Sequence, residues 1–177
     1  MALIDVIILV DATNLIESIQ NGLLSVGSVS APQSLGSWED SDLYIYMIAK
    51  RGIVYNDQEG KSELEIIANV GDSIRWTMST FGNNSEYTAF IYASEFTPFG
   101  SMSAAEYSNR EVKVYLPGGK DPNSTLKQYT NYIYSPTSKI LQGNVIIQYT
   151  LSFQLVDNET GDVIGYFSWD PFIKVNT

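Results

Sequence analysis

The sequence predicts an all-β fold, an antiparallel β-sandwich of Greek-key or jelly-roll type with one short helix after the first strand. Stretches rich in Val, Ile and Tyr recur with Gly, Pro and Asn between them, at the spacing of about 8–12 residues that is typical of sandwiches. One segment has helical periodicity, which is too little to cover a parallel sheet. With 177 residues and no linker, we expect a single domain spanning residues 1–177.

The first strand and the helix come at the start of the chain. Residues 3–10 form an apolar run rich in Ile and Val, which predicts a strand covered on both faces. Asn14 and Glu17 have the spacing of a capping box, and Gly22 is placed to end the helix. The segment that follows, residues 25–37, is rich in Ser, Gly and Pro and is predicted to be a loop.

Short apolar or alternating segments predict the remaining strands. They lie at residues 43–50, 63–68, 73–80, 87–93, 112–116, 145–156 and 163–169, the last two as a hairpin. In 63–68 the pattern sets Glu63 opposite Leu64, on the outer face of a half-buried strand. The segment 120–138 is polar and contains three tyrosines. The core is expected to include Ile74, Trp76, Phe153, Leu155, Phe167 and Trp169.

Composition excludes several classes of chemistry. The chain has no His and no Cys, so Ser–His and Cys–His catalysis, thiolate or imidazole metal sites and disulfides are impossible. Its net charge of −10 opposes nucleic-acid binding, which needs an electropositive surface. With 20 acidic residues, carboxylate pairs occur by chance and do not indicate a glycosidase. We therefore expect no catalytic residues, no cofactor, no metal and no nucleic-acid partner.

The start of the chain does not resemble a secretory signal. Residues 2–10 include Asp5 and no basic residue, and the first positive side chain is that of Lys50. The apolar runs are much shorter than the roughly 20 residues of a membrane helix. We expect a cytoplasmic protein without membrane insertion.

An acidic loop is the first candidate site. Glu39, Asp40 and Asp42 follow Trp38 in the chain. Alternating carboxylates are ligands that calcium prefers, but the EF-hand pattern and its glycine are missing. The alternative is a solvated turn in which the Asp and Ser side chains bond to nearby backbone donors.

Aromatic side chains form the second candidate site. Trp38 and three tyrosines, Tyr129, Tyr132 and Tyr134, are the aromatic residues that we expect to be exposed and to contact a ligand or a partner. Aromatic rings beside Asp and Asn are typical of carbohydrate-binding surfaces. The same residues are also common in strands, where a polar edge faces water.

Charge is distributed unevenly along the chain. All six charged residues before Lys50 are negative, whereas residues 110–139 carry a net charge of +3. If the two regions lie on different faces, copies of the chain can associate in a salt-dependent way. A second route to association is pairing between protomers through residues 145–153, a segment without a charged side chain, if this segment lies at a sheet edge.

Four stretches of sequence together resemble the AidA/PixA family of bacterial inclusion body proteins. They are residues 5–11 (DVIILVD), 35–46 (LGSWEDSDLYIY), 63–76 (ELEIIANVGDSIRW) and 165–171 (GYFSWDP). The resemblance implies abundant intracellular inclusions, expression that depends on cell density and bacteria that live with or attack invertebrates. It supplies no catalytic residues. The inclusion-forming branch is methionine-rich, whereas this chain has four Met, so the AidA-like branch is the nearer match.

These observations predict a non-enzymatic protein of the inclusion body family. We expect it to act through self-association as a homo-oligomer, in the cytoplasm or in inclusions there, with a link to an invertebrate host. The alternative is a carbohydrate-binding, lectin-like module that uses loop aromatics.

Overall fold

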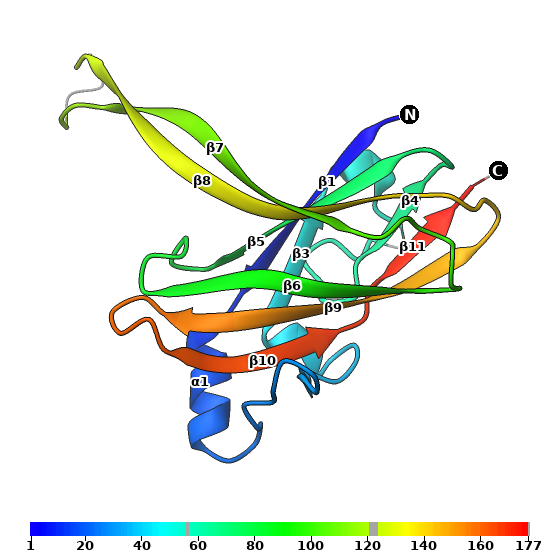
Figure 1. Ribbon diagram of the computed structural model, residues 1–177, viewed down its shortest axis with the longest axis horizontal. Helices are drawn as coiled ribbons and strands as arrows, with labels where there is room; N and C mark the ends of the chain where they lie inside the picture. The colour runs from blue at the N-terminus through cyan, green and yellow to red at the C-terminus, as the bar shows by residue number, and fades with distance from the viewer. Residues whose placement is uncertain (56, 121–123, 177) are drawn as a thin grey trace.

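Two mixed β-sheets pack face to face in the computed structural model, which describes residues 1–55, 57–120 and 124–176 (Figure 1). The strands are β1 (Leu3–Val10), β2 (Gln33–Ser34), β3 (Ile45–Ala49), β4 (Glu65–Ala68), β5 (Ser73–Thr80), β6 (Tyr87–Thr97), β7 (Glu106–Pro117), β8 (Leu126–Lys139), β9 (Ile146–Asp157), β10 (Val163–Trp169) and β11 (Phe172–Val175). The helix α1 (Ala12–Gln20) follows β1, as predicted, and two 3₁₀ turns lie at Ser41–Leu43 and Arg51–Ile53.

The sandwich is confirmed, but its strands are not all antiparallel. One sheet has the order β3-β1-β5-β8-β7, and the other has the order β2-β10-β9-β11-β4 with β6 paired to β9. The pairs β1–β5, β2–β10 and β4–β11 are parallel. Alternation of apolar residues records which face of a strand is buried but not the direction of its neighbour, so the sequence pattern does not reveal these pairs.

The first strand is covered on one face rather than on both. Val6, Ile8 and Val10 of β1 are fully buried, whereas Leu3 and Ile7 are about half exposed. In a two-layer sandwich the outer face of a strand has no second layer to cover it, even when its side chains are apolar.

The helix begins one turn earlier than predicted. The carboxylate of Asp11 accepts a hydrogen bond from the backbone N–H of Asn14 at 3.0 Å and caps α1. Asn14 is therefore inside the helix, and its side chain donates to the carbonyl of Leu43. An aspartate satisfies the free N–H groups of a first turn as well as an asparagine does, and here the chain enters the helix directly from β1.

The predicted core residues are all buried. Trp76, Phe153, Phe167 and Trp169 are at most 1% exposed, and so is Tyr149. Across the sandwich, the ring centroids of Trp76 and Tyr149 are 5.4 Å apart, and within one sheet Phe153 is edge-on to Trp169 at a centroid distance of 5.7 Å. Each large apolar side chain that is removed from water contributes about 1.5–3 kcal/mol to the hydrophobic driving force.

The predicted hairpin of residues 145–156 and 163–169 is present as β9 and β10. However, β9 has β6 on one side and β10 and β11 on the other. Residues 146–153 therefore do not lie at a sheet edge, and the condition for their pairing between protomers is not met.

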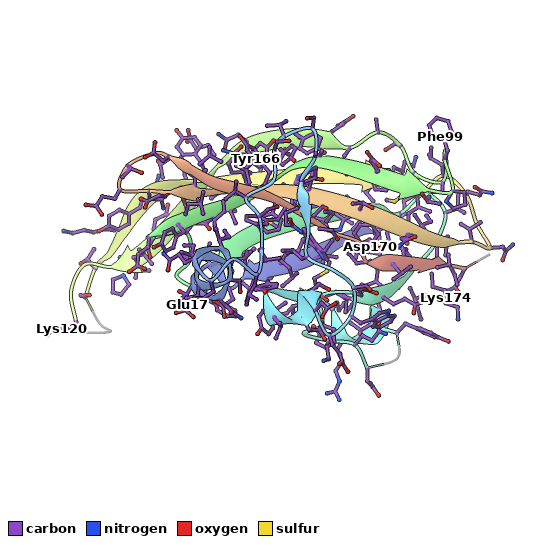
Figure 2. All side chains as sticks on the ribbon, turned by 90° about the horizontal axis from the view of Figure 1, so that it is seen from below. Glu17, Phe99, Lys120, Tyr166, Asp170 and Lys174 are labelled. Atoms are coloured by element: carbon purple, nitrogen blue, oxygen red, sulfur yellow. The ribbon has the colours of Figure 1, made fainter. Side chains whose placement is uncertain are left out.

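The strand β8 is absent from the sequence prediction and is the longest strand described. It pairs with β7 along the whole length of β7, from the pair Glu106 and Thr137 to the pair Pro117 and Leu126. It pairs with β5 only through its last residues, 137–139. The outer parts of the two strands, residues 109–117 and 126–134, project beyond the sandwich as a two-stranded arm (Figure 1). Lys120 marks the far end of this arm in Figure 2.

Candidate functional site

One of the three carboxylates of the acidic loop, that of Asp42, anchors the loop to the neighbouring segment. Asp42 accepts hydrogen bonds from the backbone N–H of Ser62 at 2.7 Å and from its hydroxyl at 2.8 Å. Its other oxygen pairs with Lys61 Nζ at 2.9 Å. Burial opposes ionisation of Asp42, but the bonds from Lys61 and Ser62 outweigh it and lower the pKa of this carboxyl. Glu39 and Asp40 are exposed.

A buried glutamate anchors the same loop and contradicts the outward orientation predicted for it. Glu63 is 2% exposed, and its Oε1 accepts the backbone N–H of Trp38 at 2.7 Å. Burial raises the pKa of Glu63, and the negative charges of Asp170 and Asp42 raise it further against the opposing bond from Trp38. The residue lies just before β4, where period-two alternation does not apply.

Serine hydroxyls and an indole complete this arrangement, which we call the loop cluster (Trp38, Ser41, Asp42, Ser62 and Glu63). The hydroxyls of Ser41 and Ser62 are 2.7 Å apart. The indole N–H of Trp169 donates to the carbonyl of Ser62 at 3.0 Å. Three of the four stretches that carry the family resemblance therefore meet at or beside this cluster: residues 35–46, 63–76 and 165–171. They are joined there by hydrogen bonds and packing contacts that hold the loop in place.

The loop cluster offers little to a metal ion. Within the part of the chain that the structure describes, no group of three or more acidic side chains is placed to hold one. Both oxygens of Asp42 already accept bonds from Lys61 and Ser62. The arrangement is a hydrogen-bonded turn that fixes the entry to β3.

The aromatic candidates do not come together. Trp38 is in the loop between β2 and β3 and is 52% exposed. Tyr129, Tyr132 and Tyr134 are on the arm, 46%, 61% and 36% exposed respectively. Tyr134 contacts Phe90 edge-on at 5.7 Å, so the last of the three tyrosines is attached to the sandwich while the other two are farther out along the arm.

A cleft of about 730 Å³ opens where the arm leaves the sandwich. Its lining comes from β5, β6, β8 and the turn between β5 and β6, and consists of Thr77, Met78, Ser79, Asn83, Asn84, Thr88, Ala89, Phe90, Asn131, Tyr132, Ile133 and Tyr134. Sequence reasoning missed this cleft because it depends on the separation of two strands rather than on a motif.

A proline explains the separation. In the pairing of β5 with β8, Ile74 lies opposite Ser138, and the last pair is Arg75 with Thr137. If the pairing continued, Trp76 would lie opposite Pro136. Proline has no N–H to donate to a neighbouring strand. On its other side Pro136 stays in register with Tyr107 of β7, so β8 continues with β7 and departs from β5.

Acidic side chains surround the end of the sandwich beside the cleft. Asp11, Glu86, Asp157 and Glu159 line two neighbouring hollows at the β5–β6 and β9–β10 turns. We call this region the acidic end. In Figure 1 both turns lie on the side of the molecule from which the arm projects.

A model of the PixA inclusion body proteins matches residues 2–175. The chain belongs to the PixA family. A crystal structure of a PixA inclusion body protein from Burkholderia cenocepacia J2315 has a TM-score of 0.70 with it at 19% identity, over 98% of this chain and 95% of the other, so the two share a fold.

Another solved structure is much less similar to this PixA-family chain. A cysteine protease inhibitor from Entamoeba histolytica has a TM-score of 0.31 at 13% identity, over 63% of this chain and 84% of its own. At that level the likeness carries no argument. No curated protein sequence matches. In the described residues no helix has the length and apolar character needed to cross a membrane.

Proposed function

We propose that this PixA-family protein is non-enzymatic and acts by self-association, and that the arm is the surface through which copies assemble. The observation that carries the proposal is the exposure of apolar side chains along the arm. Tyr115, Leu116, Leu126 and Tyr132 are each more than half exposed. A two-stranded hairpin is at best marginally stable alone in water, so contact with a second molecule would stabilise it.

Charge supports the same proposal. Residues 110–139 carry +3 and the whole chain −10, so the remainder carries −13. Lys113 and Lys127 are exposed on the arm, whereas Glu86 and Glu159 belong to the acidic end. Opposite charges on different parts of one surface favour association between copies and set its orientation.

The buried carboxylates Glu63 and Asp72 have structural roles, which supports a binding protein rather than an enzyme. Glu63 accepts the N–H of Trp38, and Asp72 accepts the backbone N–H groups of Ala2 and Asn69. Groups whose bonds fix the backbone are not free to exchange protons with a substrate.

Removal of the arm tests the proposal. Arg110 and Ile133 are cross-strand partners, and by the alternation set by the Gly118–Thr125 bond they form a hydrogen-bonded pair, so an Asn-Gly turn in place of residues 111–132 closes a short hairpin. In light scattering, we expect the average molar mass of the unaltered protein to rise with concentration and the shortened chain to stay monomeric. The far-UV circular dichroism of the shortened chain, compared per strand residue, should match that of the unaltered chain and so show that it is folded. An unaltered chain that is monomeric at high concentration would overturn self-association.

We extend the proposal to location: the assembled protein accumulates in cytoplasmic inclusions, consistent with the family, and serves the interaction of a bacterium with an invertebrate host. A fluorescent fusion compared with its arm-less form tests the first part, since foci should depend on the arm.

Carbohydrate binding is the second candidate function, and the cleft is the place that favours it. Tyr132 and Tyr134 lie there beside Asn83 and Asn131, so ring faces and amides are adjacent. A glycan array decides between the two: reproducible binding that is lost in Tyr132→Ala but kept in Trp38→Ala would place a sugar in the cleft, and a blank array would remove the candidate.

A further inference from the structure

We propose that two copies pair the outer parts of their β8 strands edge to edge and antiparallel, so that two arms form one four-stranded sheet about a two-fold axis. This inference rests on the proposed self-association and names its contact: the edge of residues 126–134 that faces away from β7, here called the open edge.

The direction of the backbone groups on β8 follows from its bonds. At the end of the arm the carbonyl of Thr125 accepts from Gly118 on the β7 side. Backbone groups alternate between the two edges of a strand, so the odd-numbered residues of this stretch bond to β7. The N–H and C=O groups of Gln128, Thr130 and Tyr132 therefore point to the open edge. The recorded register of β5 reaches only Thr137, so β5 does not cover this edge.

One side chain already occupies part of the open edge. The N–H of Tyr132 donates to the side-chain oxygen of Asn131 at 2.8 Å. This contact is local and exposed, so a strand that offers carbonyl groups can replace it at little cost.

The sequence of the open edge lacks the usual protection against pairing. Soluble proteins block exposed edges with charged side chains, proline or short strands. Beyond Lys127, residues 128–135 contain no charge, no proline and no glycine, and five of these eight residues are Tyr, Thr or Ile. By contrast, β7 carries Arg110, Glu111 and Lys113 and ends at Pro117.

A second copy of the chain fits this edge best, and in antiparallel orientation. Lys127 is the single charged residue between Leu126 and Tyr134. A two-fold axis near Thr130 would set Lys127 beside Ile133 of the second copy and keep the two lysines at opposite ends, whereas parallel pairing would bring them together. The basic arm would then extend toward the acidic end of the other copy.

Proline substitution tests the open edge selectively. Thr130→Pro removes an N–H that points to the open edge, while Asn109→Pro removes one that points outward from β7, and both leave the β7–β8 bonds in place. We expect Thr130→Pro to raise the dissociation constant of the dimer by about tenfold or more, and Thr130→Lys to do the same without proline strain. Asn109→Pro should dimerise like the unaltered chain.

Cross-linking gives a second, independent measurement. Because the chain has no cysteine, Thr130→Cys introduces a single thiol. We expect a short bis-maleimide to yield a covalent dimer from Thr130→Cys and none from Asn109→Cys. If Thr130→Cys does not cross-link and Thr130→Pro assembles normally, while the arm-less chain is monomeric, edge pairing is wrong and assembly through the arm stands. If the unaltered chain is monomeric, both proposals fail.

Discussion

The indole N–H of Trp169 lies 3.0 Å from the carbonyl oxygen of Ser62, although the two residues are 107 positions apart in the chain. The same N–H is 3.4 Å from the sulfur of Met47. This bond joins the end of β10 to the segment that holds the acidic loop. Trp169, Ser62 and Met47 are all buried, and Met47 belongs to β3 in the opposite sheet, so the indole contacts both the loop and the facing layer.

Trp169→Phe should therefore destabilise the protein strongly. The substitution leaves a buried carbonyl without its donor and a void beside it, which together cost about 2–4 kcal/mol of unfolding free energy. Urea denaturation measures the loss. The matched control is Trp38→Phe, since Trp38 is exposed and should change stability by less than about 0.5 kcal/mol. Equal effects would show that the bond contributes nothing.

Glu63 should make stability fall as pH rises above the ordinary range for a glutamate. Its folded-state pKa is raised by burial, so between about pH 4.3 and that raised value the folded state binds more protons than the unfolded state. Glu63→Gln keeps an acceptor for the N–H of Trp38 and removes this penalty. We expect the variant to match or exceed the unaltered chain at pH 7 and to lose the advantage near pH 4. If the stability of Glu63→Gln and that of the unaltered chain change with pH in parallel, the raised pKa of Glu63 would be contradicted.

Calcium should leave the melting temperature unchanged. Asp42 already bonds to Ser62 and Lys61, which leaves Glu39 and Asp40 as exposed carboxylates without a third partner near them in the described chain. Differential scanning fluorimetry in millimolar calcium, with EDTA and Asp40→Asn as controls, is the measurement. A rise in melting temperature that both controls abolish would establish an ion site.

Salt should weaken assembly without abolishing it. The basic arm and the acidic end attract one another through water, and ionic strength of about 0.5 M screens such charges within a few ångströms. Light scattering from low to high sodium chloride should show a larger dissociation constant, with or without chelator, and a residual dimer held by backbone bonds. If the dissociation constant does not change with salt, charge attraction does not contribute to assembly, and the proposal of edge pairing is unaffected.

Asp11→Ala should cost about 1 kcal/mol, since it removes the cap of α1. Asn14→Ala should cost less, because its side chain makes one exposed bond to Leu43. Thermal denaturation of the two variants ranks them. The opposite ranking would favour the capping box that the sequence alone indicates.

The sequence predicts those parts of the fold in which one face of a strand is buried. In β5 every second residue from Ile74 to Met78 packs inward, and this period is visible in the chain itself. In β8 the outer residues are exposed on both faces, so no alternation marks the strand. A third case is Glu63, whose burial depends on a distant backbone N–H that local pattern cannot supply.

The candidate sites were predictable to a similar extent. Exposure of Trp38 and of the tyrosines follows from their polar surroundings in the sequence. The cleft does not, since it arises where one proline interrupts pairing between strands that are distant in the chain.

Pro136 also divides β8 into a long outer part and a short buried part, and the two have different thermodynamic consequences. Ser138, on one side of it, is buried in the sandwich, and Tyr132, on the other, is mostly in solvent. A substitution in the buried part alters the unimolecular equilibrium between folded and unfolded chains. In the assembly that we propose, one in the outer part alters an equilibrium that depends on concentration. Mutation within a single strand would then adjust how tightly copies assemble while leaving the tolerance of each copy to heat and denaturant unchanged.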